Sequence, residues 1–327
     1  MKMRFLRKMT FLLCIIVIPL FAEWGYPQEA EIAKYPSRPV TFIVPVPPGG
    51  TTDLVCRLIS KEAEKFLGQP IVILNKPGAS FTIAISAIAS SKPDGYTIGY
   101  AGHPGLFVVP LTEKVPYHPV KDLRQIMQFG YLNISVTVKG DSPFAGFKDI
   151  VAYARQNPKR LTYGSAGVGS FGHLAMEQIA KRENVQFIHI PFKGSPETQT
   201  ALLGGHILVA TGDFNYSLLE SGQIRLILLI TEEHSPYYPN IPILKDLGYD
   251  IPAPTFLNVA GPKGLSDDVV KKLDEAFSKA MKEPGFIKGM RDLRLTIFYR
   301  NGKDLDSHVA TNYDAFAKLL KEEGLLK

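Results

Sequence analysis

Apolar residues change period repeatedly along the chain from residue 40 onward. The run VTFIVPV at 40–46 predicts a strand, and the 3.6-residue period of 53–67 predicts a helix that Gly68 closes. Further strands are expected at 70–75 and 96–101, with a helix between them at 81–91. This βαβαβ order favours a parallel sheet with helices on both faces.

A second series of the same kind follows a stretch that contains four prolines between 104 and 119. It predicts strands at 134–140, 161–166, 187–191, 207–214 and 224–231, and helices at 147–157, 170–183 and near 196–203. The last third predicts strands at 255–261 and 295–300 and helices at 267–281 and 303–321. If these last elements return to the first sheet, the chain crosses twice between two domains, as in a hinged, two-lobed binding protein. Periodicity permits this return but does not prove it.

The N-terminal segment is expected to be an export signal. MKMRFLRKM carries four basic residues, and an apolar run too short to span a bilayer comfortably follows it, so residues 1–30 are read as a signal peptide cut after Ala22 or Ala30. Its removal lowers the formal net charge from +6 to +2 or +4, so the basicity does not argue for a nucleic-acid partner. Only Cys56 then remains, which excludes an intrachain disulfide.

Two glycine-rich loops each join an expected strand to an expected helix. The first is PVPPGGTTD at 45–53, and the second is YGSAGVGSFGH at 163–173. Their consecutive N–H groups lie at a helix N-terminus, where the helix dipole favours an anion. Phosphate, an acyl intermediate and a carboxylate are all candidates for the first loop. Two such loops, one in each domain, would hold opposite ends of one anionic ligand.

Other chemistries have weaker signals. Gly167, Gly169 and Gly172 spell G-x-G-x-x-G, but no acidic residue ends the next strand to bind a ribose. The first loop lacks the Gly-Lys-Ser/Thr of a phosphate-binding loop, and no serine stands in G-x-S-x-G. The seven histidines show no metal-ligand spacing. A hydrolase built on Ser170, His173 and Asp213 can be imagined, although helical spacing also brings His173 beside Ser170 for packing.

Four ordered motifs carry a family resemblance. They are YPSRPVTFIVPVPPGGTTDLVCRLIS, NKPGASFTIAISAIASSKPDGYTIGYAG, YGSAGVGSFGHLAMEQIA and IHIPFKGSPETQTALLGG. Together they resemble the periplasmic substrate-binding proteins of tripartite tricarboxylate transporters, the Bug or TctC-type family, over nearly the whole chain after the leader. The resemblance implies an α/β, two-lobed periplasmic-binding-protein fold of type II. Each lobe would be a mainly parallel sheet flanked by helices, with the ligand cleft between the lobes, and the expected lobes are 31–132 with 254–327, and 133–253.

The resemblance also implies a function and a site. The protein would be a monomeric periplasmic receptor without catalysis, metal or cofactor, which binds a small organic carboxylate and delivers it to the membrane permease subunits of the transporter. An exported enzyme with a nucleotide at the second loop, and a ligand sensor that partners a membrane kinase, stay open as alternatives. The expected ligand-binding residues are Val46, Pro48, Gly49, Gly50, Thr51, Thr52, Asp53, Ala79, Ser80, Phe81, Ser165, Gly167, Val168, Gly169, Ser170, His173 and Asp213.

Some of these residues have structural readings as well. Thr52 and Asp53 could serve only to cap a helix, while Asp53 could receive an ammonium from an amino-acid ligand. Cys56 is expected in the core. Ser80-Phe81 stands where the family usually has Gly-Gly, so Phe81 could narrow the pocket or stack on an aromatic acid, and citrate is not carried over as the ligand.

Overall fold

The computed structural model of the chain describes residues 35–322 and 324–326. The expected signal peptide at 1–30 lies outside them. Tyr35–Lys327 form one compact unit, in which the strands make two sheets with separate apolar cores. We call the six-stranded sheet with its helices the first lobe, and the five-stranded sheet with its helices the second lobe.

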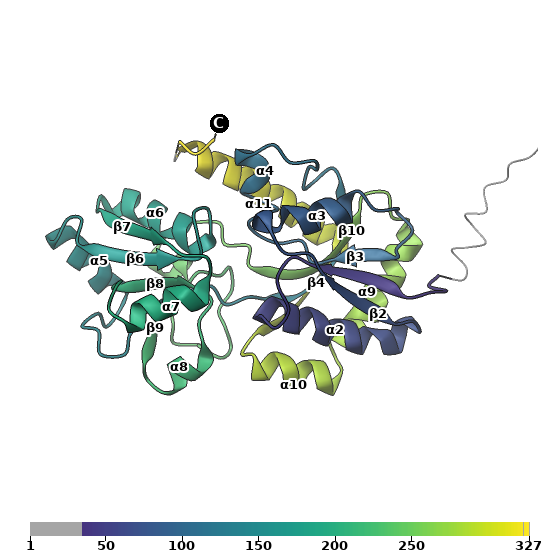
Figure 1. The fold of residues 1–327 in the computed structure, drawn as a ribbon, viewed down its shortest axis with the longest axis horizontal. Coiled ribbons are helices and arrows are strands. Elements are labelled where there is room, and N and C mark those ends of the chain that lie inside the picture. Colours follow the sequence, from purple (N-terminus) through teal and green to yellow (C-terminus); the bar gives the residue numbers. More distant parts are fainter. Residues whose placement is uncertain (1–34, 323, 327) are drawn as a thin grey trace, which may run out of the picture. The chain divides into compact units, whose positions relative to one another are not determined.

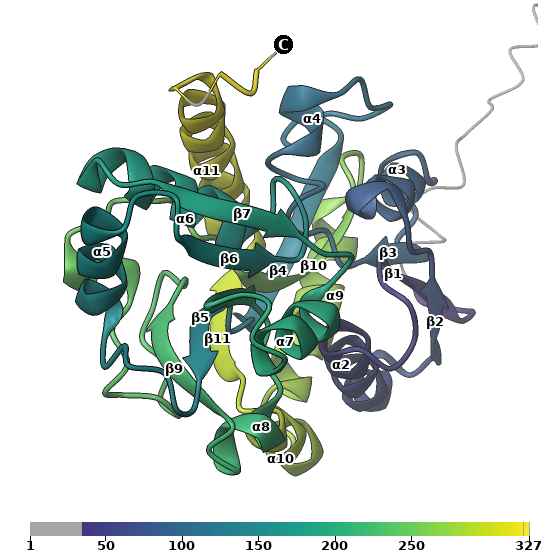
Figure 2. The same ribbon diagram turned by 60° about the vertical axis from the view of Figure 1, so that its left-hand side comes forward.

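The first lobe combines elements from both ends of the chain, so purple and yellow-green segments meet in one sheet (Figures 1 and 2). Its strand order is β11-β4-β10-β3-β1-β2. The strands are β1 (Val40–Val44), β2 (Ile71–Asn75), β3 (Thr97–Gly99), β4 (Leu123–Tyr131), β10 (Phe256–Pro262) and β11 (Thr296–Asn301). The helices are α2 (Thr51–Leu67), η1 (Ala79–Phe81), α3 (Thr82–Ala89), α4 (Val109–Thr112), α9 (Asp267–Ala280), α10 (Pro284–Asp292) and α11 (Gly302–Glu322). The expected return of the last elements to the first sheet is therefore confirmed.

The second lobe is built from the middle of the chain, and its strand order is β7-β6-β8-β5-β9. The strands are β5 (Ser135–Lys139), β6 (Leu161–Ser165), β7 (Phe187–Pro191), β8 (Val209–Gly212) and β9 (Ile224–Leu229). The helices are α5 (Phe147–Gln156), α6 (Phe171–Glu183), α7 (Ser195–Leu203), α8 (Tyr216–Glu220) and η2 (Leu244–Leu247).

The expectation that each sheet is mainly parallel is wrong, because both sheets are mixed. β1 pairs in parallel with β2 and β3, and β6 pairs in parallel with β7 and β8. In contrast, β10 is antiparallel to β3 and β4, and β5 is antiparallel to β8 and β9. The reason is the double crossing between lobes. The first strand after each crossing begins beside the carboxyl ends of its neighbouring strands, so it must run opposite to them.

Apolar cores cover both faces of the first sheet. On one face, Phe42 and Phe129 pack with Phe277 of α9 and Phe286 of α10. A second core, with α3 and α11, covers the other face, as the positions of these helices in Figure 1 also show. This second core includes the buried Leu174 from α6 of the second lobe, so it joins the two lobes. Among the described residues, no helix is both long and apolar enough to cross a membrane.

The expected elements are largely found, with ends shifted by one or two residues in most cases. β1 stops at Val44 because Pro45 follows, and α2 begins at Thr51. Five elements that the structure describes lie wholly outside the expected ranges: β4, α4, α8, α10 and η2. β4 lacks an alternating pattern because Gln125 and Gln128 are buried in it beside apolar residues, at 1% and 0% exposure.

Candidate functional site

The first glycine loop is held from behind by Asp53, whose side chain is 1% exposed. Its Oδ2 accepts hydrogen bonds from the Gly49 N–H and from Arg57 Nε, both at 2.9 Å, and its Oδ1 accepts one from Asn75 Nδ2 at 2.7 Å. Burial alone would raise the pKa of this carboxyl, but the bonds from Arg57, Asn75 and Gly49 outweigh it and lower the pKa. Asp53 is therefore a charged anchor of the loop.

No side chain caps the N-terminus of α2. Gly50 occupies the N-cap position with φ −76° and ψ 164°, and it has no side-chain atom to accept a bond. The first N–H groups of a helix have no partner within the helix. The N–H groups around Thr51 and Thr52 therefore remain available, at the end of the helix where the dipole is positive.

The two adjacent glycines have different physical roles. Gly49 has φ +92°, which favours glycine whatever the surrounding space. Gly50 has an ordinary extended backbone, and a Cβ built on it would meet nothing within 4 Å. Neither the backbone nor the packing therefore requires a glycine at position 50. Both glycines and Pro48 are exposed, while Val46 packs partly buried against the core.

The loop at 79–81 has an unusual backbone. Ala79, Ser80 and Phe81 have φ of 43°, 51° and 77°, three successive left-handed residues without a glycine among them. Such conformations store strain and often occur at ligand sites. Glycine adopts positive φ at little cost, so the Gly-Gly pair that the resemblance led us to expect at positions 80 and 81 would suit this backbone. Ala79 and Ser80 are exposed, and the Phe81 ring lies edge-on to Tyr100 at 6.3 Å.

The second glycine loop carries its own cap. The Ser170 hydroxyl accepts the backbone N–H of His173 at 3.4 Å, and His173 Nδ1 accepts the N–H of Gly169 at 3.1 Å. Gly167 and Gly169 have φ of +104° and +79°. Any side chain at Gly172 would overlap Thr211, so this glycine allows α6 to pack closely on β8. The G-x-G-x-x-G pattern is thus accounted for by the local fold.

Ser165 also directs its hydroxyl into the protein. The residue is fully buried, and its Oγ donates to the Gly167 carbonyl at 2.9 Å. His189 Nε2 lies 2.7 Å from the same oxygen, within hydrogen-bond distance. The His173 and His189 rings are 4.2 Å apart, and burial lowers the pKa of both, that of His189 to about 4. Val168, in contrast, is 68% exposed at the tip of the loop.

His103 links the second loop to the first lobe. Its Nε2 donates to the Gly169 carbonyl at 2.9 Å, and its ring stacks on Phe171 at 3.6 Å. Burial lowers the pKa of His103 to about 3, although the bond to Gly169 opposes the shift, so the ring is neutral. A Cβ on Gly169 would lie 3.1 Å from Val108, also in the first lobe. The second loop is therefore positioned partly by the lobe it faces.

Asp213 follows β8 and Tyr100 follows β3, and they are near enough for the charge of Asp213 to act on the Tyr100 hydroxyl. The Asp213 main chain is fixed, because its N–H donates to Ser195 Oγ at 3.1 Å and its carbonyl accepts from Gln199 Nε2 at 3.0 Å. Its carboxylate makes no hydrogen bond to any residue that the structure describes. Burial raises the pKa of Asp213 to about 6, and the charge of Asp213 helps to raise the pKa of Tyr100. This places an unpaired carboxylate between the lobes.

The geometry does not assemble the imagined hydrolase. The Ser170 hydroxyl and the His173 ring are both engaged by backbone N–H groups, and the Asp213 carboxylate bonds to neither of them. Within the described part of the chain, no group of three or more His, Cys, Asp or Glu side chains could hold a metal ion. Cys56 is fully buried, as expected, and burial raises the pKa of its thiol.

Sequence reasoning missed three residues that shape this region: Asn75, Tyr100 and His103. Each follows or ends a parallel strand of the first sheet, and the carboxyl ends of such strands are where ligands bind in open α/β sheets. That position was the available signal. It is weaker than a glycine motif, because the residue types alone indicate no chemistry.

The comparisons with known proteins agree on one family. The family described as "Tripartite tricarboxylate transporter family receptor" (TctC) matches residues 55–325. A relative from Cupriavidus necator, the "UPF0065 protein in gbd 5'region", is 35% identical over 302 residues, which cover 92% of each chain.

Three solved structures are similar over most of their lengths. The periplasmic binding protein BugD has a TM-score of 0.74 at 27% identity, covering 90% of this chain and all of its own. Rpa4515 of R. palustris with adipate has a TM-score of 0.75 at 28% identity, covering 89% and 98%. MatC of Rhodopseudomonas palustris with bound malate has a TM-score of 0.73 at 25% identity, covering 88% and 100%. The two-lobed fold of type II periplasmic binding proteins is therefore the fold of this chain.

Proposed function

Because the chain belongs to the tripartite tricarboxylate transporter receptor family, whose members are solute-binding receptors, we propose that it binds a small organic carboxylate between its lobes and delivers it to the membrane permease subunits. It would do so as a monomer in the periplasm, without catalysis. The similar structures with adipate and malate support a carboxylate as the ligand class. The lobe boundaries near 132/133 and 253/254 would then act as the hinge.

The observation that carries this proposal is the open N-terminus of α2. A carboxylate at Gly50 would accept the free N–H groups of the first turn, and hydrogen bonds to a charged group contribute roughly 1.5 to 3 kcal/mol each. The absence of any structural need for glycine at position 50 fits a requirement for close approach by a ligand. Asp53 would fix the loop through its bond to the Gly49 N–H and would not itself contact the anion.

Asp213 narrows the chemistry of the ligand. An unpaired carboxylate beside a bound anion is unfavourable unless the ligand brings a donor, such as a hydroxyl or an ammonium group, or unless the two carboxyls share a proton. A shared proton and an ammonium donor predict opposite changes in ligand affinity with pH. A shared proton makes binding tighter as the pH falls toward 6, whereas an ammonium donor makes binding weaker because Asp213 loses its charge. Titration calorimetry at pH 5.5 and 8 on wild type and Asp213→Asn separates them. A pH dependence that is unchanged in Asp213→Asn would remove Asp213 from the site.

The central test compares Gly50→Val with Gly146→Val. Gly146 is also the N-cap of a helix, has extended backbone, and leaves open space for a Cβ, so it is a matched control outside both loops. Both variants should fold with wild-type stability. In a thermal-shift screen with malate, adipate, succinate, citrate, acidic amino acids, NAD and ATP, a ligand at 100 times its Kd adds about 2.7 kcal/mol.

We expect a carboxylate to stabilise wild type and Gly146→Val but not Gly50→Val. Equal stabilisation of Gly50→Val would rule out the α2 terminus as the site. Stabilisation by NAD or ATP alone would replace the receptor with a nucleotide-binding enzyme. Purified permease subunits that fail to bind the loaded protein would favour the sensor alternative.

A further inference from the structure

Arg294 of the first lobe contacts the second lobe through its side chain. It stands between α10 and β11, and its Nη2 donates at 2.5 Å to the hydroxyl of Tyr216, the first residue of α8. Its guanidinium carbon lies 4.6 Å from the centre of the Tyr216 ring and 5.7 Å from that of Tyr237, in the segment that connects β9 to β10. One cation of the first lobe thus contacts two aromatic rings beyond it.

The Tyr216 hydroxyl is oriented to accept the bond from Arg294. It donates its own proton to Glu220 Oε1, one turn further along α8. Its lone pairs then remain for a partner, and Arg294 supplies a charged donor. Hydrogen bonds with a charged partner are stronger than bonds between neutral groups. The Arg294–Tyr216 bond is therefore of the stronger kind, although both side chains are partly exposed.

The backbone of Arg294 favours a different residue. Its φ is +55°, a left-handed conformation that is unfavourable for a residue with a Cβ and that glycine adopts freely. Such a residue often ends a helix, and here the N–H groups of Arg294 and Leu295 bond to the Arg291 and Met290 carbonyls at 3.0 and 2.9 Å. A glycine would serve this turn better. The arginine therefore fits a role for the side chain, which is the contact with the second lobe.

The main chain of Arg294 is fixed to the first crossing between the lobes. Its carbonyl accepts a hydrogen bond from Asn133 Nδ2 at 2.7 Å, and Asn133 is buried in the short link between β4 and β5. The side chain of Arg294 therefore extends from this link to Tyr216. A rotation of the second lobe that moves Tyr216 away by about 1 Å breaks the bond, because groups about 3.6 Å apart no longer form one.

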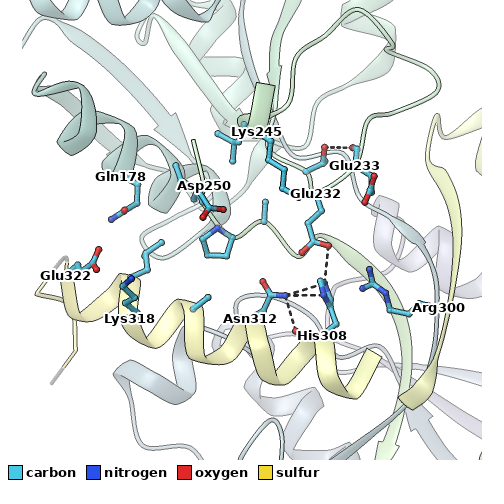
Figure 3. A pocket seen from close by; sticks show the side chains of 17 residues that line it. Gln178, Glu232, Glu233, Lys245, Asp250, Arg300, His308, Asn312, Lys318 and Glu322 are labelled. Carbon is cyan, nitrogen blue, oxygen red and sulfur yellow. Dashed lines mark hydrogen bonds and ion pairs between the residues drawn. The ribbon is translucent and has the colours of Figure 1, made fainter. Parts of the chain in front are cut away.

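The two lobes are not closely packed everywhere. A cavity of about 530 Å³ lies between α11 of the first lobe and the segment that connects β9 to β10, and Gln178 of the second lobe also lines it. Figure 3 shows Glu232 extending from that segment to the His308 ring on α11, where Oε2 and Nε2 are 3.0 Å apart. Because open space separates the walls of this cavity, the angle between the lobes can change there without compressing packed side chains.

We propose that Arg294 is a positioning residue for ligand binding, which holds the second lobe in the arrangement of this structure through its bond to Tyr216. This inference rests on the proposed function, in which the ligand is bound between the lobes. A receptor that adopts its binding arrangement for only part of the time binds with an affinity reduced by that fraction. Arg294 therefore raises the affinity for every ligand by the same factor, without contacting any of them.

The test separates the side chain from the backbone. Arg294→Gly removes the contact with Tyr216 and relieves the left-handed conformation, so this variant should fold. Lys159→Gly is the matched control, because Lys159 has φ +58°, carries the same charge and is exposed in the turn before β6, within the second lobe. Spin labels at the exposed positions Lys61→Cys on α2 and Lys148→Cys on α5 report the distance between the lobes by pulsed electron paramagnetic resonance.

Calorimetry on the same variants gives the Kd of malate, adipate and any other carboxylate that binds wild type. We expect Arg294→Gly to broaden the distance distribution of the ligand-free protein and to weaken every carboxylate by a common factor of about ten, as for one charge-assisted bond. Tyr216→Phe keeps the ring but loses the acceptor, so the double variant should bind no more weakly than Arg294→Gly alone. Lys159→Gly should match wild type in both measurements.

The proposal is overturned if Arg294→Gly and wild type give the same distance distribution and the same Kd values, or if Lys159→Gly shows the same changes as Arg294→Gly. It is also overturned if different carboxylates lose affinity by different factors while the distances stay the same, because Arg294 would then contact the ligand. If no carboxylate binds wild type, the proposed function fails. The distances in the ligand-free protein still decide whether Arg294 holds the lobes.

Discussion

The loop before α2 and the loop before α6 are both glycine-rich turns from strand to helix, but their polar groups are satisfied differently. The first loop is anchored by a carboxylate of its own lobe, Asp53, and leaves its helix terminus uncapped. The second is capped by its own Ser170 and receives a hydrogen bond from His103 across the lobes. Under the proposed function, this difference gives the loops separate tasks: the first would offer donors to an anion, and the second would respond to the position of the facing lobe.

Removing the Asp53 carboxylate should destabilise the first loop, and with it the protein. Asp53→Ala leaves Arg57, Asn75 and the Gly49 N–H without their acceptor, so we expect a loss of about 2 to 4 kcal/mol of stability. Urea denaturation at pH 7.5 measures it. Asp141→Ala is the control, since the Lys139–Asp141 pair is exposed and should be worth less than about 1 kcal/mol. Similar losses in both variants would mean that Asp53 does not anchor the loop.

Capping α2 should make the two loops alike. Gly50→Asp places an acceptor at the N-cap, which should raise stability by a few tenths of a kcal/mol while it occupies the donors that an anion would use. We expect carboxylate affinity to fall by at least about a hundredfold, since roughly two charge-assisted bonds are lost and a like charge is added. Calorimetry with whichever carboxylate binds wild type measures the fall. Unchanged affinity would show that the anion binds elsewhere.

His103→Leu should remove the hydrogen bond that joins the second loop to the first lobe, with a smaller effect on stability. The variant loses the bond to Gly169 and the stacking on Phe171, at a cost of about 1 to 2 kcal/mol at pH 7.5. Because the pKa of His103 is lowered to about 3, wild type loses stability as the pH falls below 6.5, and the variant lacks this loss. The difference between them should shrink by about 2 kcal/mol at pH 5. The exposed His206→Leu is the control, and a difference that stays constant with pH would contradict a buried neutral His103.

The sequence predicted most strands and helices because their periods are clear, and it predicted both loops because glycine before a helix has few explanations. It did not predict β4, whose buried glutamines interrupt the apolar pattern. It also could not tell Gly49 from Gly50. Only the backbone angles show that the first glycine serves the turn, and only the open space around the second shows that the fold does not require it.

The roles of polar residues were harder to predict than their positions. Ser165 and Asp53 stand in loops that the sequence indicated, but their side chains point into the protein and hold those loops. His103 donates a hydrogen bond to Gly169 of the opposite lobe, and Tyr100 feels the charge of Asp213 there; both depend on the folded arrangement of distant segments. Long-range contacts of this kind depend on which strand ends face each other. The local sequence pattern does not determine that arrangement.

The strand order of the first sheet also has a consequence for the order of folding. β4 reaches β3 only through β10, which lies between them, and β11 then covers the outer edge of β4. Both β10 and β11 come after the entire five-stranded sheet along the chain. The second lobe can therefore complete its pairings from one continuous segment, while the first lobe has to wait for the last quarter of the chain. Such non-local pairing slows folding, so the first lobe stays incomplete until the last strands of the chain are available to pair with β3 and β4.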